Sequence, residues 1–339
     1  MSEDILIKAP LGLLPVLIFL VILLYMDSYK LVGLKAVLWM IAAGALTPVL
    51  AYFANGYLQE LLQIDFKSLS RYVAPLSEET LKALVIVALF RMNRIGFLVD
   101  SAIMGFAVGA GFAFVENVLN LQTLGNAHVA VWIVRGFGTA IMHGGVTAIF
   151  AIMAQALTER HMKINPLLYI PGFLVAATLH SAFNHFVLPP LQMTLFVLTI
   201  LPPLLYLVFK RSAMRLHAWL ELDFDADARL LNQINSGEFA ESRIGQFLHD
   251  LRDKFDGPVV VDMLCYLRLY TELALRAKGV LMMREHGLDA PIGERTREKF
   301  VEMEYLEGTI GKTGVLAMRP FLLMTRKDLW QLYVLESHD

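Results

Sequence analysis

The sequence predicts an all-α membrane protein, a polytopic bundle of about seven transmembrane helices followed by a helical soluble domain. Of the 339 residues, 57% are hydrophobic and 18% are charged, and the mean hydropathy is +0.57. A soluble domain has about 25% charged residues, and several apolar runs here are long enough to cross a bilayer. The composition therefore excludes a water-soluble enzyme, a secreted disulfide scaffold and a disordered protein.

Charged residues are unevenly distributed along the chain. Residues 1–209 hold 21 of the 60 Lys, Arg, Asp and Glu residues, and residues 210–339 hold 39. We therefore expect a transmembrane domain over 1–209 and a cytoplasmic helical domain over 210–339. The net charge of −2 argues against a nucleic-acid partner, which needs a basic face. A single cysteine, Cys265, excludes an internal disulfide and a zinc site made of cysteines alone.

Seven apolar segments are expected to cross the membrane. The first follows an acidic start, unlike a signal peptide with its basic n-region, and is interpreted as an anchor. The fifth is expected to begin at Gly136, because Arg135 near a helix end can reach the interface. The third begins with charged residues, which is unusual for a helix that faces lipid. The predicted spans are 10–26, 33–53, 73–90, 97–120, 136–157, 167–187 and 191–209.

The positive charges of the short loops predict the orientation. Lys and Arg are enriched in loops on the cytoplasmic side. They follow the third, fifth and seventh spans, and the opposing pair Lys67 and Arg71 lies among acidic residues. With seven spans, this places the N-terminus outside and residues 210–339 in the cytoplasm, in a multi-pass protein of the plasma (inner) membrane. The loop positives are Arg91, Arg94, Arg160, Lys163, Lys210, Arg211 and Arg215.

Ionisable and polar side chains occur within four of these spans. Such groups are costly in a bilayer and usually face a cavity. Counted along the helices, they lie roughly 6–10 Å from the outer ends of their spans, which predicts one polar site in the outer half of the membrane. His185 is about 140° around the helix from His180 and is interpreted as structural. The candidate residues are Glu78, Glu79, Lys82, Glu116, Asn117, His143, His180 and Asn184.

This set of side chains permits water activation. A lone Glu–Lys pair is usually a structural ion pair, but three glutamates and two histidines at one depth favour a functional site. We expect Glu79 to be the general base, with Glu78 and Glu116 as alternatives, and Asn184 to contact the oxyanion. Two histidines and a glutamate could hold zinc. Because Lys82 can reach the same carboxylates, a site without metal or cofactor is favoured.

Four motifs, in order, resemble the PrsW family of intramembrane, glutamic-type proteases, within the clan of CAAX-processing and bacteriocin-immunity proteins. They are Glu78-Glu79-Thr80-Leu81-Lys82, Phe112 to Asn117 (F-x-x-x-E-N), His143 in the third polar helix, and His180 to Asn184 (H-x-x-x-N). The resemblance covers roughly 70–210. It implies cleavage of a membrane-anchored protein substrate, such as an anti-sigma factor. Lys82 matches PrsW, whereas the prenyl-protease branch has an arginine one place later, which argues against CAAX cleavage.

Two other classes of function are weighed against a protease. A proton- or cation-coupled transporter or channel usually shows inverted repeats, and the sequence has no internal repeat. A non-catalytic receptor would act through its cytoplasmic domain, where 259–285 is apolar at helical spacing. Residues 308–313 resemble a phosphate-binding loop, but Leu306 occupies the position of its first glycine. We expect this domain to oligomerise, to dock on the membrane domain or to sense a partner.

Overall fold

The chain folds into helices that form two compact units in the computed structural model. Described are residues 3–27, 31–92, 94–124, 126–158, 165–221, 224–236, 238–285 and 294–322, with the single positions 288 and 329. Over these residues the chain has no β-strand, and the all-α fold class is confirmed. The two units are Met1–Ser212 and Ala213–Ser337, and the sequence places the division three residues earlier, after residue 209.

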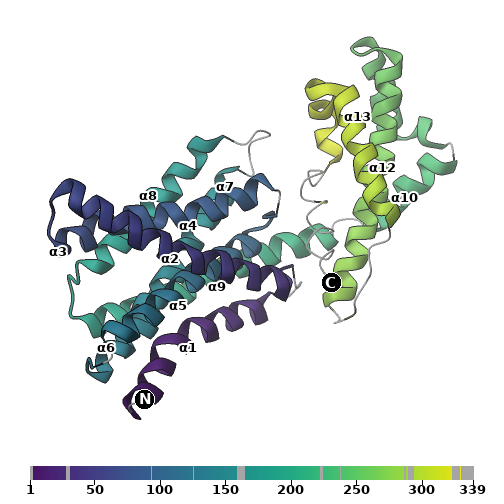
Figure 1. The fold of residues 1–339 in the computed structure, drawn as a ribbon. Coiled ribbons are helices and arrows are strands. Elements are labelled where there is room, and N and C mark those ends of the chain that lie inside the picture. The colour runs from purple at the N-terminus through teal and green to yellow at the C-terminus, as the bar shows by residue number, and fades with distance from the viewer. Residues whose placement is uncertain are drawn as a thin grey trace. The chain divides into compact units, whose positions relative to one another are not determined.

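Seven long helices of the first unit follow the order of the predicted spans (Figure 1). They are α1 (Glu3–Met26), α2 (Leu34–Leu62), α4 (Ala74–Arg91), α5 (Leu98–Thr123), α7 (Ile141–Thr158), α8 (Ile170–Asn184) and α9 (Pro190–Glu221), which continues past the division. Short segments connect them: α3 (Phe66–Ser68), the π-helix η1 (Leu69–Val73), α6 (Val129–Ile133), the π-helix η2 (Val134–Ala140) and the 3-10 helix η3 (Pro166–Tyr169).

Six helical stretches among the described residues are long and apolar enough to cross a membrane. The predicted third span is helix α4, which is not one of them because its 18 residues include Glu78, Glu79, Lys82 and Arg91. This helix packs against α2 and α8 inside the unit, as expected for a charged helix at membrane depth. The six are Leu6–Met26, Leu34–Leu62, Leu98–Thr123, Val129–Thr158, Pro166–Asn184 and Pro190–Met214.

The fifth predicted span begins earlier than the sequence suggested. Helix α6, η2 and α7 form one continuous apolar segment from Val129 to Thr158. Arg135 therefore lies within this segment rather than at its end. Its charge is tolerated because its guanidinium is paired with Glu116, so the interface is not needed to solvate it.

Helix α5 is the buried centre of the first unit, and small residues bring its neighbours close. It packs mainly against α7 and α2 (Figure 1). A Cβ atom added at Gly44 of α2 would overlap the carbonyl of Val108, and one added at Gly109 would overlap the carbonyl of His143 in α7. Glycines at such crossings let helix backbones touch, which is a common way for helices to pack in membranes.

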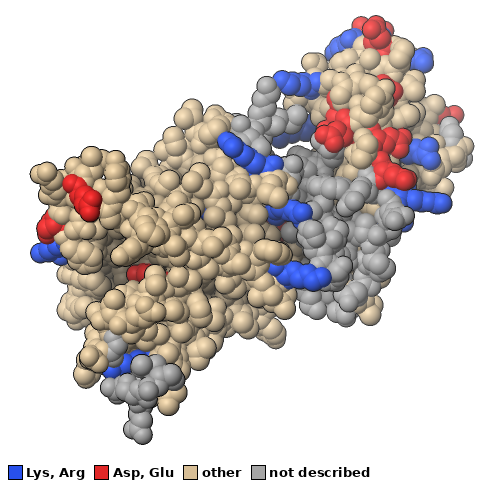
Figure 2. Space-filling view, viewed as in Figure 1, with Lys and Arg blue, Asp and Glu red and all other residues tan. Residues whose placement is uncertain are grey.

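The face of the first unit seen in Figure 2 is mostly uncharged, and an acidic side chain is visible at the floor of a hollow in this face. Charged side chains are dense on the described part of the second unit. This difference agrees with the uneven charge of the sequence. Arg160 and Lys163, two of the loop positives used for the orientation, lie outside the described residues.

The second unit is a small helical assembly around α12 (Gly257–Glu285), which corresponds to the predicted apolar segment 259–285. Of the core candidates on this helix, Leu267, Tyr270 and Leu273 are buried, whereas Leu264 and Leu275 are only partly buried. The other elements are α10 (Phe224–Ser236), η4 (Glu238–Glu241), α11 (Arg243–Asp250), η5 (Leu251–Asp253), α13 (Glu294–Met318) and η6 (Arg319–Phe321).

The segment that resembles a phosphate-binding loop lies within helix α13. A phosphate-binding loop needs a strand before it and a helix after it, and this segment has helix on both sides. Gly311 has a φ of 70° at a break in that helix, a conformation that glycine adopts without steric cost. The glycine therefore serves a bend in the chain.

Gly44 and Gly56 of α2 offer a matched test of this packing. Gly44→Ala should destabilise the first unit by about 1–3 kcal/mol, the usual cost of overfilling a packed interior, because the new methyl meets the backbone of Val108. Gly56→Ala meets nothing within 4 Å and should cause no loss. Thermal unfolding in detergent measures both. Equal stability of the two variants would contradict close α2–α5 packing.

Candidate active site

Helix α4 contributes Glu78, Glu79 and Lys82 to the site. Asp65 caps α3 by accepting a hydrogen bond from the Ser68 amide at 3.3 Å, and η1 leads directly into α4. Pro75 occupies the first turn of α4 and has no N–H to donate to the preceding π-helical turn. The i,i+3 spacing then places Glu79 and Lys82 on the same face.

Glu79 is held by two partners in the interior of the unit. Its Oε1 lies 2.5 Å from Nζ of Lys82 and 2.8 Å from Nδ1 of His180. Lys82 is fully buried, and Glu79 and His180 are 2% and 1% exposed. Because the ammonium neutralises the carboxylate, the pair can persist away from water. The carboxylate in turn fixes the orientation of the His180 ring.

Glu78 lies at the edge of the same cluster and is less enclosed. Its side chain is 16% exposed, and Oε2 is 3.8 Å from Nε2 of His180. Its Oε1 accepts a hydrogen bond from the Asn55 amide of α2 at 3.3 Å, and Asn55 also accepts one from Ser77. A gap of 3.8 Å is too long for a direct hydrogen bond, but a bridging water can fill it.

His143 of α7 stands between Lys82 and Glu116. Its Nδ1 is 3.2 Å from Nζ of Lys82, and its Nε2 is 3.2 Å from Oε2 of Glu116. Because an ammonium can only donate, Nδ1 must accept, and the neutral ring carries its proton on Nε2, directed toward Glu116. The His143 and His180 rings meet edge to face, with centroids 4.7 Å apart.

Arg135 joins the cluster, although the sequence analysis left it at the membrane interface. Its Nη2 lies 3.0 Å from Oε1 of Glu116, and its Nε donates to Oδ1 of Asn117 at 2.8 Å. The amide of Asn117 donates to the carbonyl of Gly12 in α1 at 2.7 Å. In the sequence, a lone arginine next to an apolar run was the one indication that Arg135 could belong to the site. Asn55, the other residue missed, lies in α2 without a motif around it.

The structure therefore brings six of the eight predicted residues into one group and leaves the other two beside it. Asn117 contacts the group through Arg135. Asn184 donates its amide to the carbonyl of Ser70 at 2.9 Å and so ties α8 to η1. This hydrogen bond gives Asn184 a local partner other than a substrate oxygen. The six are Glu78, Glu79, Lys82, Glu116, His143 and His180.

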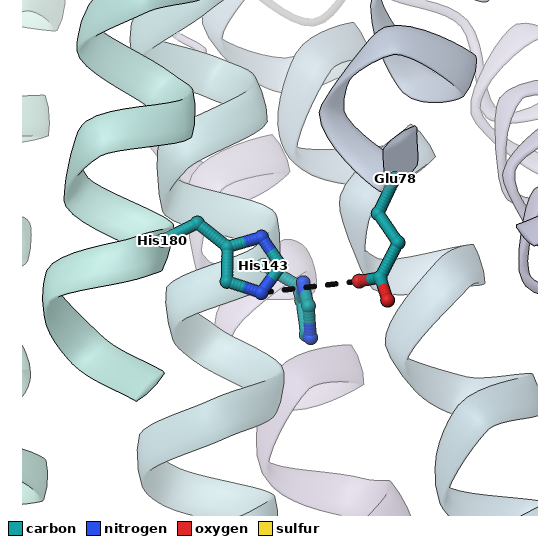
Figure 3. A group of neighbouring side chains, drawn as sticks. All are labelled: Glu78, His143 and His180. Atoms are coloured by element: carbon teal, nitrogen blue, oxygen red, sulfur yellow. Dashed lines mark ion pairs between the residues drawn. The ribbon is translucent and has the colours of Figure 1, made fainter. Parts of the chain in front are cut away.

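Three of these residues have the donor types of a metal site. Glu78, His143 and His180 each offer one ligand atom, and these atoms lie within 4.8 Å of one another. Figure 3 shows the two rings and the carboxylate converging from three helices. Two imidazoles and a carboxylate are a known zinc ligand set with an open position, and carboxylates behind the rings are typical of such sites. Glu79 and Glu116 stand in those places, so the donor set fits a zinc ion.

A bundle of apolar helices that encloses carboxylates, imidazoles and an ammonium has the residue types of a membrane-embedded hydrolase. The family model described as PrsW family intramembrane metalloprotease matches residues 33–209, and the chain belongs to this family. It is thus an intramembrane protease at the level of the family. Comparison with curated proteins and with solved structures found no match. The family match confirms the resemblance seen in the motifs, and it begins after α1.

Substitution of Lys82 tests whether its ion pair with Glu79 stabilises the folded protein. Lys82→Met removes the partner of a buried carboxylate, and breaking such a pair costs about 3–5 kcal/mol. Thr80→Ala, an exposed change in the same helix, should cost little. Adding Glu79→Gln to Lys82→Met should recover part of the loss, because the unpaired charge is then gone. Unfolding in detergent measures all three, and an unchanged Lys82→Met stability would contradict the pairing.

Proposed function

We propose that this protein hydrolyses a peptide bond in a membrane-anchored protein, using water activated beside Glu78. The observation that carries the proposal is the contrast between the two neighbouring glutamates. Glu79 is occupied by Lys82 and His180, whereas Glu78 is partly exposed and faces Nε2 of His180 across 3.8 Å. We therefore assign the base to Glu78, and Glu79 becomes the residue that orients His180.

The cluster can hold a water molecule between two acceptors. Because Nδ1 of His180 donates to Glu79, the neutral ring leaves a lone pair on Nε2, opposite the carboxylate of Glu78. A water bound there can donate one hydrogen bond to each. Its oxygen is then free to attack a peptide carbonyl, while Glu78 takes the proton and passes it to the leaving amine. Asn184 is not part of this proposal.

A metal ion held by Glu78, His143 and His180 would, when bound, polarise the water and the peptide carbonyl. Glu79 and Glu116 would then act from behind the two imidazoles. Lys82, 3.2 Å from Nδ1 of His143, is the group that opposes a second cation. The family description and the donor set favour the metal, whereas the positive charge of Lys82 favours its absence.

The expected substrate is a single-pass membrane protein, such as an anti-sigma factor, as implied by the family resemblance. With α4 counted as a seventh crossing, the loop charges support an N-terminus outside, a cytoplasmic 210–339 domain and residence in the plasma membrane. A site in the outer half of the membrane would then cut its substrate near the outer surface. A homo-oligomer is compatible with this arrangement, and no nucleic-acid partner is expected.

Glu78→Gln keeps the side-chain volume and removes the basic oxygen. Loss of a general base typically costs 10²–10⁴ in rate, and we expect a loss of this size in the cleavage of a doubly tagged single-pass anti-sigma factor reconstituted with the enzyme in vesicles. Glu60→Gln, an exposed change on α2, is the matched control and should keep full activity. Near-normal cleavage by a folded Glu78→Gln variant would exclude Glu78 as the base.

Elemental analysis of the purified protein distinguishes the two versions of the site. With a metal, we expect zinc in about equal amount to the protein, its loss in His143→Ala and His180→Ala, and inactivation by a chelator. His128→Ala, on a histidine outside the group, should keep the zinc. Activity that survives chelation, in protein free of zinc, would assign the reaction to the glutamates alone.

A further inference from the structure

We infer that Arg135 is a positioning residue, which holds Glu116 against His143 and so fixes the orientation of that imidazole. The inference rests on the proposed function. Arg135 was expected at the membrane interface, and the reaction proposed above gives it no role. Its contacts nevertheless connect the cluster to two further elements of the fold, η2 and α1.

The guanidinium of Arg135 contacts two consecutive residues of α5. One nitrogen lies 3.0 Å from Oε1 of Glu116, and another donates to Oδ1 of Asn117 at 2.8 Å. Asn117 is anchored in turn by its hydrogen bond to the Gly12 carbonyl of α1. Arginine presents several donors in a rigid plane. Arg135 therefore cannot turn away without breaking both contacts, and Glu116 is held in one place.

The contact made by the second carboxylate oxygen of Glu116 indicates that Arg135 does more than form a structural ion pair. Oε2 is buried and lies 3.2 Å from Nε2 of His143, and it has no other hydrogen-bond partner within the described residues. One carboxylate thus faces the guanidinium and the imidazole with different oxygens. A carboxylate behind a functional imidazole sets its tautomer and ring orientation. Because Glu116 is held in one place, the His143 ring that faces it is held in one orientation.

The π-helix η2 and helix α1 complete this support. A Cβ atom at Gly136 would overlap the carbonyl of Leu11, so η2 and α1 touch next to Arg135. Gly12, the acceptor for Asn117, lies one residue further along α1. Helix α1 precedes the region matched by the family model. The arrangement of the active site thus depends on a helix that lies outside the family match.

Kinetics of matched variants in the vesicle assay test the inference. Arg135→Gln should lower kcat by about 10–100-fold, the usual effect of removing a group behind a functional histidine, with little change in KM. Glu116→Gln should lower it by a similar or larger factor. If Arg135 acts through Glu116, the double variant should be no worse than Glu116→Gln alone. Arg71→Gln removes a charge outside the group, whose guanidinium donates to the His185 carbonyl, and should keep full activity.

Nitrogen NMR of protein labelled with ¹⁵N-histidine supplies a readout that does not require turnover. The His143 signals, assigned with His143→Gln, should shift in Arg135→Gln and in Glu116→Gln in the same direction, and should not shift in Arg71→Gln. Absence of cleavage by the wild type would overturn the proposed function, whereas the NMR shifts would still decide the role of Arg135.

Two results would overturn the inference: unchanged His143 signals in Arg135→Gln, or kinetic losses that multiply in the double variant. Should Arg135→Gln fail to fold, Arg135→Lys carries the test. It keeps the charge but not the planar set of donors, so we expect about 10-fold loss in kcat and a shift of the His143 signals. In that case, a wild-type kcat and unshifted His143 signals in Arg135→Lys would overturn the inference.

Discussion

Lys82 and Glu79 form an ion pair with almost no exposure to solvent, and the rest of the site depends on it. A carboxylate alone in this interior would be expensive to bury. Paired with Lys82, Glu79 can remain charged and accept the hydrogen bond from His180. The same ammonium faces Nδ1 of His143. One cation therefore determines the roles of two imidazoles from two different helices, which the chain could not orient by apolar packing alone.

Close packing of backbones is what brings these side chains to one place. Gly109 of α5 lies against the carbonyl of His143 in α7, and Gly144, next to that histidine, lies against the Phe106 ring. Larger side chains there would push α7 away from α5 and move His143 relative to Glu116. The glycines thus serve the site through backbone packing and contribute no side chain to it. The cost in helix propensity is offset by contacts that only a residue without a side chain permits.

Periodicity and hydropathy were sufficient to predict the helical fold and the order of the long helices, because those properties are local. Charges within the spans also indicated the group formed by Glu78, Glu79, Lys82, Glu116, His143 and His180. The sequence did not predict the hydrogen-bonding partner of each side chain. Asn184 was predicted to contact the oxyanion, and its amide donates to the Ser70 carbonyl, a partner that depends on the tertiary rotation of α8 relative to η1. Arg135 was set aside because its partners lie in two other segments.

The adjacent pair Glu78–Glu79 shows how one helix turn separates two functions. Consecutive residues of a helix differ in direction by about 100°, so the two neighbouring carboxylates reach opposite nitrogens of His180 and have different further partners. Glu79 points into the unit and is paired, whereas Glu78 points to the margin of the cluster and is reached by Asn55. A paired, enclosed carboxylate is suited to orient a histidine, and a partly exposed one is suited to exchange a proton with water. In the proposed mechanism, the repeated residue thus supplies an orienting and a reactive carboxylate from the same turn.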